Sequence, residues 1–347
     1  MYFYWYGKGE NLKPSASYLV LAFAALLCAC GQKEEPAYTQ SVFLMNVPAQ
    51  VKVYGAGEAQ GKQIADAVLG EWERISSEFS FSDKYSQTSV VNKKAYGEWV
   101  KVDEEFLRLL QLSLDYYRLT GGAFDITFAP LWPIWKEAAS TRKMPAKEDI
   151  SRALANMGSG HIQVDHQRRM VRFDKPVQIN MGGILRGYCF ARAARILRDL
   201  APGYPVELRL GSNMLAFGKR AWRYDIKDPF DDDKVFGSLN FEDGVVMSSS
   251  GREHFVQIEG KLYSHILDIK TGYPLENFSN LVVYFPRIED ESFLSSSVLA
   301  VMGKKNTFDL LSKLKGTSAV WIDGSGKEAV FSNEASRARW EKARRFF

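Results

Sequence analysis

Two adjacent glycines, Gly182 and Gly183, separate a short apolar run from a helix-like pattern in the stretch QINMGGILRGYCFARAARIL, residues 178–197. Arg186 and a third glycine follow within the next turn. Glycines let a backbone pass close to a ligand, and the amides at the start of a helix favour an anion such as phosphate, with an arginine beside it. Taken alone, this stretch favours the alternative, which is a tight turn without a ligand.

Two further stretches combine glycine turns with polar side chains. The segment GGAFDITFAPLWPIW, residues 121–135, is expected to end a helix and to expose Asp125 and Thr127 among aromatic side chains. The segment LRLGSNMLAFGKRAWRYDIKDP, residues 208–229, repeats the order strand, glycine turn, strand. Asp125 also fits a plain turn or cap position, because aspartate and glycine are both common in turns.

A fourth stretch, SSSGREHFVQIEGKLYSHILDIKTGYP at residues 248–274, places His265 and Asp268 just before a Thr-Gly turn. The alternatives are a hydrogen-bonded core histidine and an aspartate that only forms the turn. No catalytic triad, zinc-ligand spacing or pair of carboxylates in the sequence competes with these stretches, and the chain has only 4 histidines. The four stretches therefore hold the residues that could carry chemistry.

The elements that must position these residues begin with two strands, at residues 42–45 and 51–54. A turn and an amphipathic helix follow within GAGEAQGKQIADAVLGEWERISSEF, whose apolar spacing directs four side chains inward: Ile64, Val68, Trp72 and Ile75. Its first glycines, Gly55, Gly57 and Gly61, resemble the dinucleotide fingerprint GxGxxG, but the last spacing is one residue too long. No repeated strand, helix, strand unit follows in the sequence, so we expect no dinucleotide site here.

A second helix is predicted over residues 104–119, with Asp103 as its N-cap and a pair of glycines as its stop. A charged stretch covers about residues 136–149. Four or five short strands then alternate with turns as far as about residue 285, interrupted by the helix after the first pair of glycines.

The C-terminal part is expected to hold a helix over about residues 293–301, a second helix from Thr307, and an edge strand with the sequence SAVWIDG. Clusters of strands with intervening helices are typical of an α+β fold. We therefore predict mixed or antiparallel sheets with packed helices.

The first thirty residues predict secretion. Two lysines precede an apolar run at residues 18–27, which is too short for a membrane span of about 20 residues but suits a signal peptide. The sequence LCAC that follows resembles the bacterial lipobox, in which a cysteine, here Cys30, is lipidated and becomes the N-terminus. The alternative is an accidental pair of buried cysteines. This assigns residues 1–30 to a lipoprotein signal peptide and residues 31–40 to a tether.

Lipidation at Cys30 implies a protein anchored to a bacterial membrane and facing the periplasm, at the outer membrane because no aspartate follows the cysteine. Cys189 would then be the only other cysteine, so no intramolecular disulfide is expected. The formal charge of +4 is spread along the chain, which argues against nucleic acid as a partner. A hydrophobic content of 46% is enough for a large core.

The order and spacing of these motifs resemble the FAD:protein FMN transferase family, the ApbE-like periplasmic lipoproteins. The family pattern includes G-G-x-F-D-P-T, D-L-G-G-I-A-K-G-Y, L-G-G-D and H-I-x-D-P-x-T-G. Eight segments match in order: SQTSVVN, GGAFDITFAPL, NMGGILRGY, LGSNMLAFG, WRYDIKDP, SGREHF, HILDIKTGYP and FLSSSVLAVMG. The match covers nearly the whole chain after the signal peptide, and we assign residues 41–335 to one ApbE-like domain.

The resemblance implies a T-fold-like α+β protein that binds FAD as its substrate together with a divalent metal, normally Mg²⁺. Such an enzyme breaks the FAD pyrophosphate, transfers the FMN half to a threonine hydroxyl of a periplasmic or membrane flavoprotein subunit, and releases AMP. A metal bridging phosphate oxygens neutralises the developing charge, and aromatic surface accommodates the ring systems.

The resemblance also assigns roles to residues. His265 and Asp268 fall at the family's histidine and aspartate beside the reacting phosphates, and Arg186 stands at its lysine, keeping a cation there. The family's metal is held by a backbone carbonyl, here of Leu185, and by an aspartate and a threonine, of which the threonine position is Ser297. The remaining FAD contacts are Met45, Ala123, Phe124, Asp125, Asn180, Gly182 and Gly183.

The departures from the family pattern fall on charged positions. Asn180 and Asn213 replace aspartates, and the metal-binding aspartate aligns with Phe293, which has no oxygen for a hard cation. Asp290 and Glu291 precede it on other faces of a regular helix, so only an irregular helix start would bring them inward. Fewer carboxylates favour binding of FAD without metal, but weaken a transfer that needs the metal in the transition state.

Three functions stay open on the sequence alone. The first is an active FMN transferase with a modified metal site. The second is a catalytically impaired FAD-binding or flavoprotein-maturation lipoprotein of the same family. The third, an unrelated secreted adhesin or lipid-binding domain, requires all of the ordered matches to be accidental.

Overall fold

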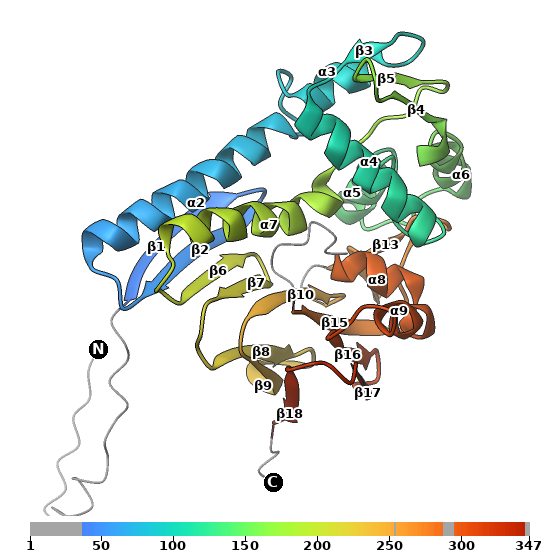
Figure 1. The fold of residues 1–347 in the computed structure, drawn as a ribbon. Helices are drawn as coiled ribbons and strands as arrows, with labels where there is room; N and C mark the ends of the chain where they lie inside the picture. The colour runs from blue at the N-terminus through green and yellow to red at the C-terminus, as the bar shows by residue number, and fades with distance from the viewer. Residues whose placement is uncertain (1–36, 253–254, 287–294, 344–347) are drawn as a thin grey trace, which may run out of the picture. The chain divides into compact units, whose positions relative to one another are not determined.

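Antiparallel pairing builds the largest sheet, an 8-stranded sheet in the order β1-β2-β6-β7-β10-β15-β16-β17 (Figure 1). The computed structural model describes residues 37–252, 255–286 and 295–343, and Cys30 and Phe293 lie outside them. β2 pairs antiparallel with both β1 and β6, so the glycines after β2 do not belong to a dinucleotide unit. The strands are β1 (Ala37–Leu44), β2 (Val47–Tyr54), β6 (Val206–Leu210), β7 (Asn213–Phe217), β10 (Gly244–Ser250), β15 (Phe278–Phe285), β16 (Ser318–Asp323) and β17 (Glu328–Ser332).

Four smaller sheets complete the strand content of the described residues. The order β18-β9-β8 joins Arg339–Lys342, Asp231–Phe241 and Trp222–Asp228. The order β3-β5-β4 joins Val100–Lys101, Met170–Phe173 and Ile162–Asp165. Two hairpins pair β11 (Phe255–Ile258) with β12 (Lys261–Ser264), and β13 (Leu267–Asp268) with β14 (Tyr273–Pro274).

The middle of the large sheet is buried on both faces, as β15 shows, because every residue of that strand is buried. Leu281 and Val283 belong to the core that also contains the inward residues of α2 (Glu58–Glu78) and α7 (Gly182–Leu200). Val282 and Tyr284 belong to a second core with β8 and β9. Figure 1 shows α2 and α7 on one side of the sheet and β8, β9 and β18 on the other. Because successive side chains of a strand point to opposite faces of the sheet, alternate residues of β15 pack in different cores.

The two helices with the strongest sequence signals are confirmed. In α2, Ile64, Val68, Trp72 and Ile75 are all buried, as their spacing predicts. α4 (Glu104–Leu119) has the predicted bounds, and the Asp103 side chain accepts a hydrogen bond from the Phe106 amide at 2.7 Å. The other helices are α3 (Gln87–Lys94), α5 (Leu131–Thr141), α6 (Lys147–Ala155), α8 (Ser296–Met302) and α9 (Lys304–Leu311). None of the helices within the described residues is long and apolar enough to cross a membrane.

Several predicted boundaries are wrong. β1 starts at Ala37, because residues 37–40 of the predicted tether pair with β2, and β18 extends the folded unit beyond residue 335. β16 is not an edge strand, since β17 pairs with its outer side. The charged stretch at residues 136–149 contains the end of α5 and the start of α6, and the strands up to residue 285 outnumber the predicted four or five.

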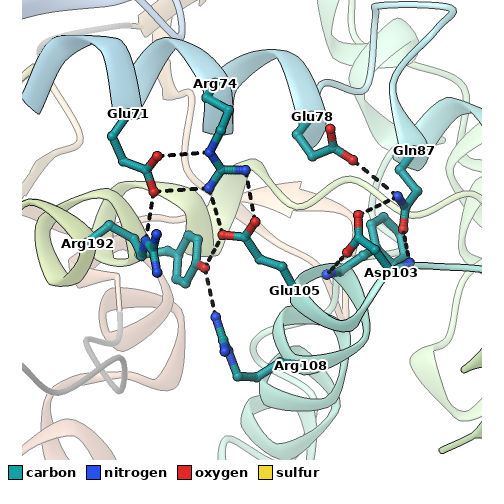
Figure 2. A network of polar contacts seen from close by, with 10 residues as sticks. Glu71, Arg74, Glu78, Gln87, Asp103, Glu105, Arg108 and Arg192 are labelled. Carbon is teal, nitrogen blue, oxygen red and sulfur yellow. Dashed lines mark hydrogen bonds and ion pairs between the residues drawn. The ribbon is translucent and has the colours of Figure 1, made fainter. Parts of the chain in front are cut away.

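A network of charged side chains joins α2, α4 and α7 (Figure 2). Arg74 on α2 donates two hydrogen bonds of 2.8 Å to Glu105 on α4, and it also bonds Glu71 one turn back. Arg192 on α7 donates to Glu71 at 2.7 Å. The Tyr188 hydroxyl, also on α7, donates to Glu105 and accepts from Arg108 at 3.1 Å. The network therefore connects the helix that begins at the paired glycines to both of its neighbours.

Burial and hydrogen bonding act in opposite directions on the acids of this network. Burial alone would raise the pKa of Glu105, but the hydrogen bonds from Arg74 and Tyr188 outweigh it, so the pKa lies below its ordinary value of 4.5. The pKa of Glu71 is lowered in the same way by Arg74 and Arg192. Burial, followed by the hydrogen bond to Glu105, raises the pKa of Tyr188 to about 12, so this hydroxyl remains a donor at neutral pH.

Replacing Glu105 by alanine is expected to lower the free energy of unfolding by about 2 kcal/mol at neutral pH, because Arg74 and Tyr188 lose their shared acceptor. A lowered folded pKa stabilises above the ordinary value, and this contribution is lost as pH falls through the folded pKa. The difference between wild type and Glu105→Ala should therefore shrink below pH 4.5, measured by denaturant unfolding across pH. Glu104→Ala, an exposed neighbour in the same first turn, is the control, and equal losses would contradict this role.

Candidate functional site

A cavity of about 250 Å³ lies where the loop after α4, the first turn of α7, β10, the segment after β12 and α8 come together. The structure brings eight of the predicted site residues to its lining: Ala123, Phe124, Asp125, Gly182, Gly183, Arg186, His265 and Ser297. The first and the last of them are 174 positions apart in the sequence (297 − 123). The antiparallel sheet and the helices on it therefore assemble a site from segments that no local pattern connects.

The paired glycines belong to the helix itself. α7 starts at Gly182, two residues earlier than predicted, and neither glycine is among those with a positive φ. A Cβ atom on Gly183 would lie 3.2 Å from Cε2 of Phe124, and one on Gly182 would lie 3.1 Å from Oδ1 of Asn180. Close approach of neighbouring groups, rather than a left-handed turn, is therefore the reason for glycine at these positions.

The start of α7 has the chemistry of an anion site. Asn180 closes the helix end, because its Oδ1 accepts a hydrogen bond of 2.9 Å from the Gly182 amide. Arg186 follows one turn later, half-buried, and lines the cavity together with both glycines. The positive end of a 19-residue helix and a guanidinium on the same side of the cavity favour a phosphate group.

Asp125 is buried, not exposed as predicted, and so is Thr127. Oδ1 of Asp125 accepts hydrogen bonds from the Thr127 amide at 2.8 Å, the Thr127 hydroxyl at 2.6 Å and the Ser159 hydroxyl at 2.7 Å. Its Oδ2 accepts one from the Ser159 amide at 3.1 Å. This carboxylate therefore joins the loop after α4 to the segment before β4, and it holds Ala123 and Phe124 at the cavity wall.

His265 and Asp268 occupy different places. His265 is exposed and lines the cavity, directly after β12. Asp268 lies in the β13–β14 turn, where Oδ1 accepts from the Lys270 amide at 2.9 Å and the backbone carbonyl accepts from the Gly272 amide at 2.7 Å. Asp268 is not among the described residues that line the cavity, so the turn reading accounts for its contacts.

Three further residues of the predicted site, Met45, Asn180 and Leu185, are not among the described lining residues, and neither is Asn213, which replaces an aspartate of the family pattern. Met45 sits in the β1–β2 turn with a φ of 51°, and it is not among the described lining residues. Asn213 connects strands: its Oδ1 accepts from the Ser248 amide at 3.0 Å, and its Nδ2 donates to the Leu210 carbonyl at 3.2 Å. An amide supplies both a donor and an acceptor here, which a carboxylate cannot do.

The described part of the chain does not show the predicted Mg²⁺ site, whose aspartate position, Phe293, lies outside it. They contain no group of three or more histidine, cysteine, aspartate or glutamate side chains placed to hold a metal. The Ser297 hydroxyl shares a hydrogen bond of 2.7 Å with the Ser295 hydroxyl, and the residue of the predicted carbonyl ligand, Leu185, is buried. Among the described lining residues, Asp125 is the one carboxylate, and it already accepts four hydrogen bonds. A hard cation prefers several oxygen ligands that are open to it.

The helix that carries Ser297 also starts later than predicted. α8 begins at Ser296, and Ser295 has an extended backbone with ψ of 134°. Ser297 therefore lies in the first turn of α8, and the described helix does not include Ser295. Asp290, Glu291 and Phe293 lie outside the described residues.

Sequence reasoning missed several lining residues, notably Phe128, Trp132, Met247, Val298 and Val301. Trp132 lies in the aromatic stretch PLWPIW, seven residues after the predicted FAD contact Asp125, and this proximity could have identified it. Met247 lies inside a buried strand, where its sequence pattern is that of any core residue. Val298 and Val301 are likewise indistinguishable from core positions of a helix.

These features define a class of protein: an antiparallel α+β fold with a cavity for a ligand that has an anionic group and ring surface. The chain belongs to the ApbE family, whose model matches residues 45–321. This confirms the predicted family and fold class.

Named relatives and solved structures agree. The chain is 27% identical over 245 residues to an FAD:protein FMN transferase of Klebsiella pneumoniae, covering 69% of this chain and 74% of that protein. It is 25% identical over 314 residues to one of Haemophilus influenzae, covering 85% and 89%. The structure resembles the ApbE protein of Thermotoga maritima with a TM-score of 0.76 and 27% identity, covering 86% of this chain and 97% of that one. It also shares its fold with a flavin transferase ApbE of Vibrio cholerae, with a TM-score of 0.71 and 20% identity.

Proposed function

We propose that this protein is an FAD:protein FMN transferase, which moves FMN from FAD to a threonine hydroxyl of a flavoprotein and releases AMP. The observation that carries the proposal is the cavity in which Arg186 and the start of α7 face aromatic side chains and His265. Membership of the ApbE family and relatives named FAD:protein FMN transferase support it.

In the proposed reaction, different lining residues bind FAD and accept the proton. Arg186 and the positive end of the α7 dipole attract the pyrophosphate, and Phe124, Phe128 and Trp132 give surface for the rings. His265 accepts the proton of the threonine hydroxyl, the threonine oxygen forms a bond to the phosphorus of the FMN half, and the pyrophosphate bond breaks with AMP as the leaving group. Positioning of these partners supplies most of such catalysis.

The predicted Mg²⁺ and the catalytic role of Asp268 stay predictions. The described residues hold no cluster of histidine, cysteine, aspartate or glutamate side chains for the metal. Transfer measured with added Mg²⁺ and with a chelator tests the metal. For Asp268, the test is the Asp268→Asn variant. A lower transfer rate at unchanged FAD affinity would indicate a role in the reaction, whereas unchanged transfer would indicate a role in the turn alone.

We also propose that the protein is anchored through a lipid on Cys30 and faces the periplasm at the outer membrane, with a periplasmic or membrane flavoprotein subunit as its acceptor. The sequence LCAC after an apolar run supports the anchor. Incorporation of labelled palmitate by the full chain, and its loss in a Cys30→Ser chain, tests it.

The test of the activity is to incubate the purified protein with FAD and an acceptor flavoprotein domain, and to measure AMP release and covalent flavin on the acceptor. His265→Ala should lose at least about a hundredfold in rate, because general acid and base groups contribute this much. His166→Ala, at an exposed turn, is the matched control. Tight FAD binding without AMP release by wild type would replace the proposal with a binding protein of the same family.

A further inference from the structure

A second, larger cavity adjoins the first. It has a volume of about 780 Å³ and shares Trp132, His265 and Leu267 with the cavity at the start of α7. These shared residues form a common wall, so one imidazole borders both spaces. In the proposed reaction, the proton acceptor must lie within hydrogen-bond reach of the attacking hydroxyl, at the place where this hydroxyl meets the phosphate.

The lining of this second cavity is apolar and aromatic. Phe81, Trp135 and Tyr263 line it together with the shared Trp132. Trp132 is 46% exposed and Phe81 is 39% exposed, so their rings are open to a partner. Lys136 adds a positive charge, and no carboxylate is among its described lining residues. Contiguous exposed apolar surface of this kind marks a site of interaction.

The walls are held in place before any partner arrives. Trp135 donates a hydrogen bond of 2.8 Å to the Gly272 carbonyl, and its ring packs beside that of Tyr263 with 6.2 Å between the ring centroids. The backbone around Phe81 is fixed by side chains, since the Ser89 hydroxyl donates to its carbonyl at 3.3 Å. A preformed aromatic surface loses little conformational entropy on binding.

The second cavity follows α5 from Trp132 to Ala139, which is a length of about 10 Å at the helical rise. About three residues of an extended polypeptide cover this distance. The cavity is thus a groove that runs away from the shared wall, with room for the residues beside an attacking threonine.

We propose that this groove binds the acceptor polypeptide, as an extended segment with apolar side chains next to the threonine that receives FMN. The proposal rests on the proposed function and adds the surface that recognises the second substrate. The acceptor then approaches from the groove, its hydroxyl passes its proton to His265 on the shared wall, and FAD occupies the other side.

The test blocks the groove without altering the first cavity. Ala139 is exposed and lines only the groove, so Ala139→Arg fills it, while Ser140→Arg places the same side chain one position on, outside both linings. The probes are a synthetic peptide with a central threonine flanked by leucine and valine, and a matched peptide with serine and asparagine flanks. Phe81→Ala, with Tyr85→Ala from the same loop as its control, gives a second pair.

Ala139→Arg in the full chain should raise the KM for the apolar peptide about tenfold or more, and leave FAD affinity within about twofold. Ser140→Arg should change neither, and wild type should prefer the apolar peptide. An equal loss of FAD affinity in Ala139→Arg would assign the groove to FAD and overturn the proposal, as would unchanged transfer. A dimer of wild type that Ala139→Arg dissociates would make a second copy the occupant and overturn it as well.

Failure of the proposed function is a separate result. If wild type transfers no flavin to any acceptor, the groove can still be tested as a peptide-binding site. The measurement is the fluorescence anisotropy of the fluorescein-labelled apolar peptide. Peptide binding that is lost in Ala139→Arg and kept in Ser140→Arg would support the groove as the acceptor site. Absence of peptide binding to wild type would overturn the proposal.

Discussion

Arg186→Glu is expected to weaken FAD binding by at least about a hundredfold, because a charge-assisted contact to the pyrophosphate is replaced by repulsion. Arg186 lines the cavity one turn after the paired glycines, where the positive end of α7 attracts the same anion. Titration of flavin fluorescence with the folded variant measures the loss.

Arg195→Glu is the control, because it makes the same charge change farther along the same helix. It should alter FAD affinity by less than about threefold, because nine residues at the helical rise place Arg195 about 13 Å farther along α7, beyond the screening length at physiological salt. Equal losses for the two variants would show that net charge, and not a contact at the cavity, governs binding. Arg186→Lys should fall between wild type and Arg186→Glu, because lysine keeps the charge but loses the planar fork.

Asp125→Asn is expected to lower the free energy of unfolding by about 3 kcal/mol, because the side chain is buried and accepts four hydrogen bonds. An amide nitrogen in place of one oxygen would face the donor groups of Ser159. The loop that holds Phe124 would lose its connection to this segment, so FAD affinity should fall as well. Denaturant unfolding and FAD titration of the same sample measure the two effects.

Asp323→Asn provides the matched control. Oδ1 of Asp323 also accepts three hydrogen bonds, from Ser325 and Lys327, but in an exposed turn that asparagine tolerates. Its loss should stay within about 0.5 kcal/mol. Should Asp125→Asn keep full stability and lose only FAD affinity, the carboxylate would be a direct ligand contact, as the family resemblance implies, and not a structural link.

The elements that the sequence predicts well are those with local signals. α4 has the predicted bounds because Asp103 caps one end and glycines stop the other, and α2 follows from apolar spacing alone. The glycine and arginine motif of α7 and the segment with Ala123 and Phe124 do meet at one cavity, together with His265. That these motifs meet at one site could be predicted only from their order and spacing along the chain, since each motif alone also fits a turn.

What the sequence does not reveal depends on contacts between distant segments. Nothing near Asp125 indicates that Ser159, 34 positions later, supplies two of its hydrogen bonds and buries it. Asp268 matches a family position, yet its carboxylate closes a turn. The order of eight strands, and with it the inner position of β16, follows from long-range pairing that apolar patterns leave undetermined.

The polar network between α2, α4 and α7 has a consequence for motion. Arg74, Glu105 and Tyr188 tie the first turn of α4 and the first half of α7 to α2, so the helix that carries Arg186 is held in place before a ligand binds (Figure 2). We therefore expect the backbone around Arg186 to keep its position when FAD binds, so that little conformational entropy is lost at this part of the site.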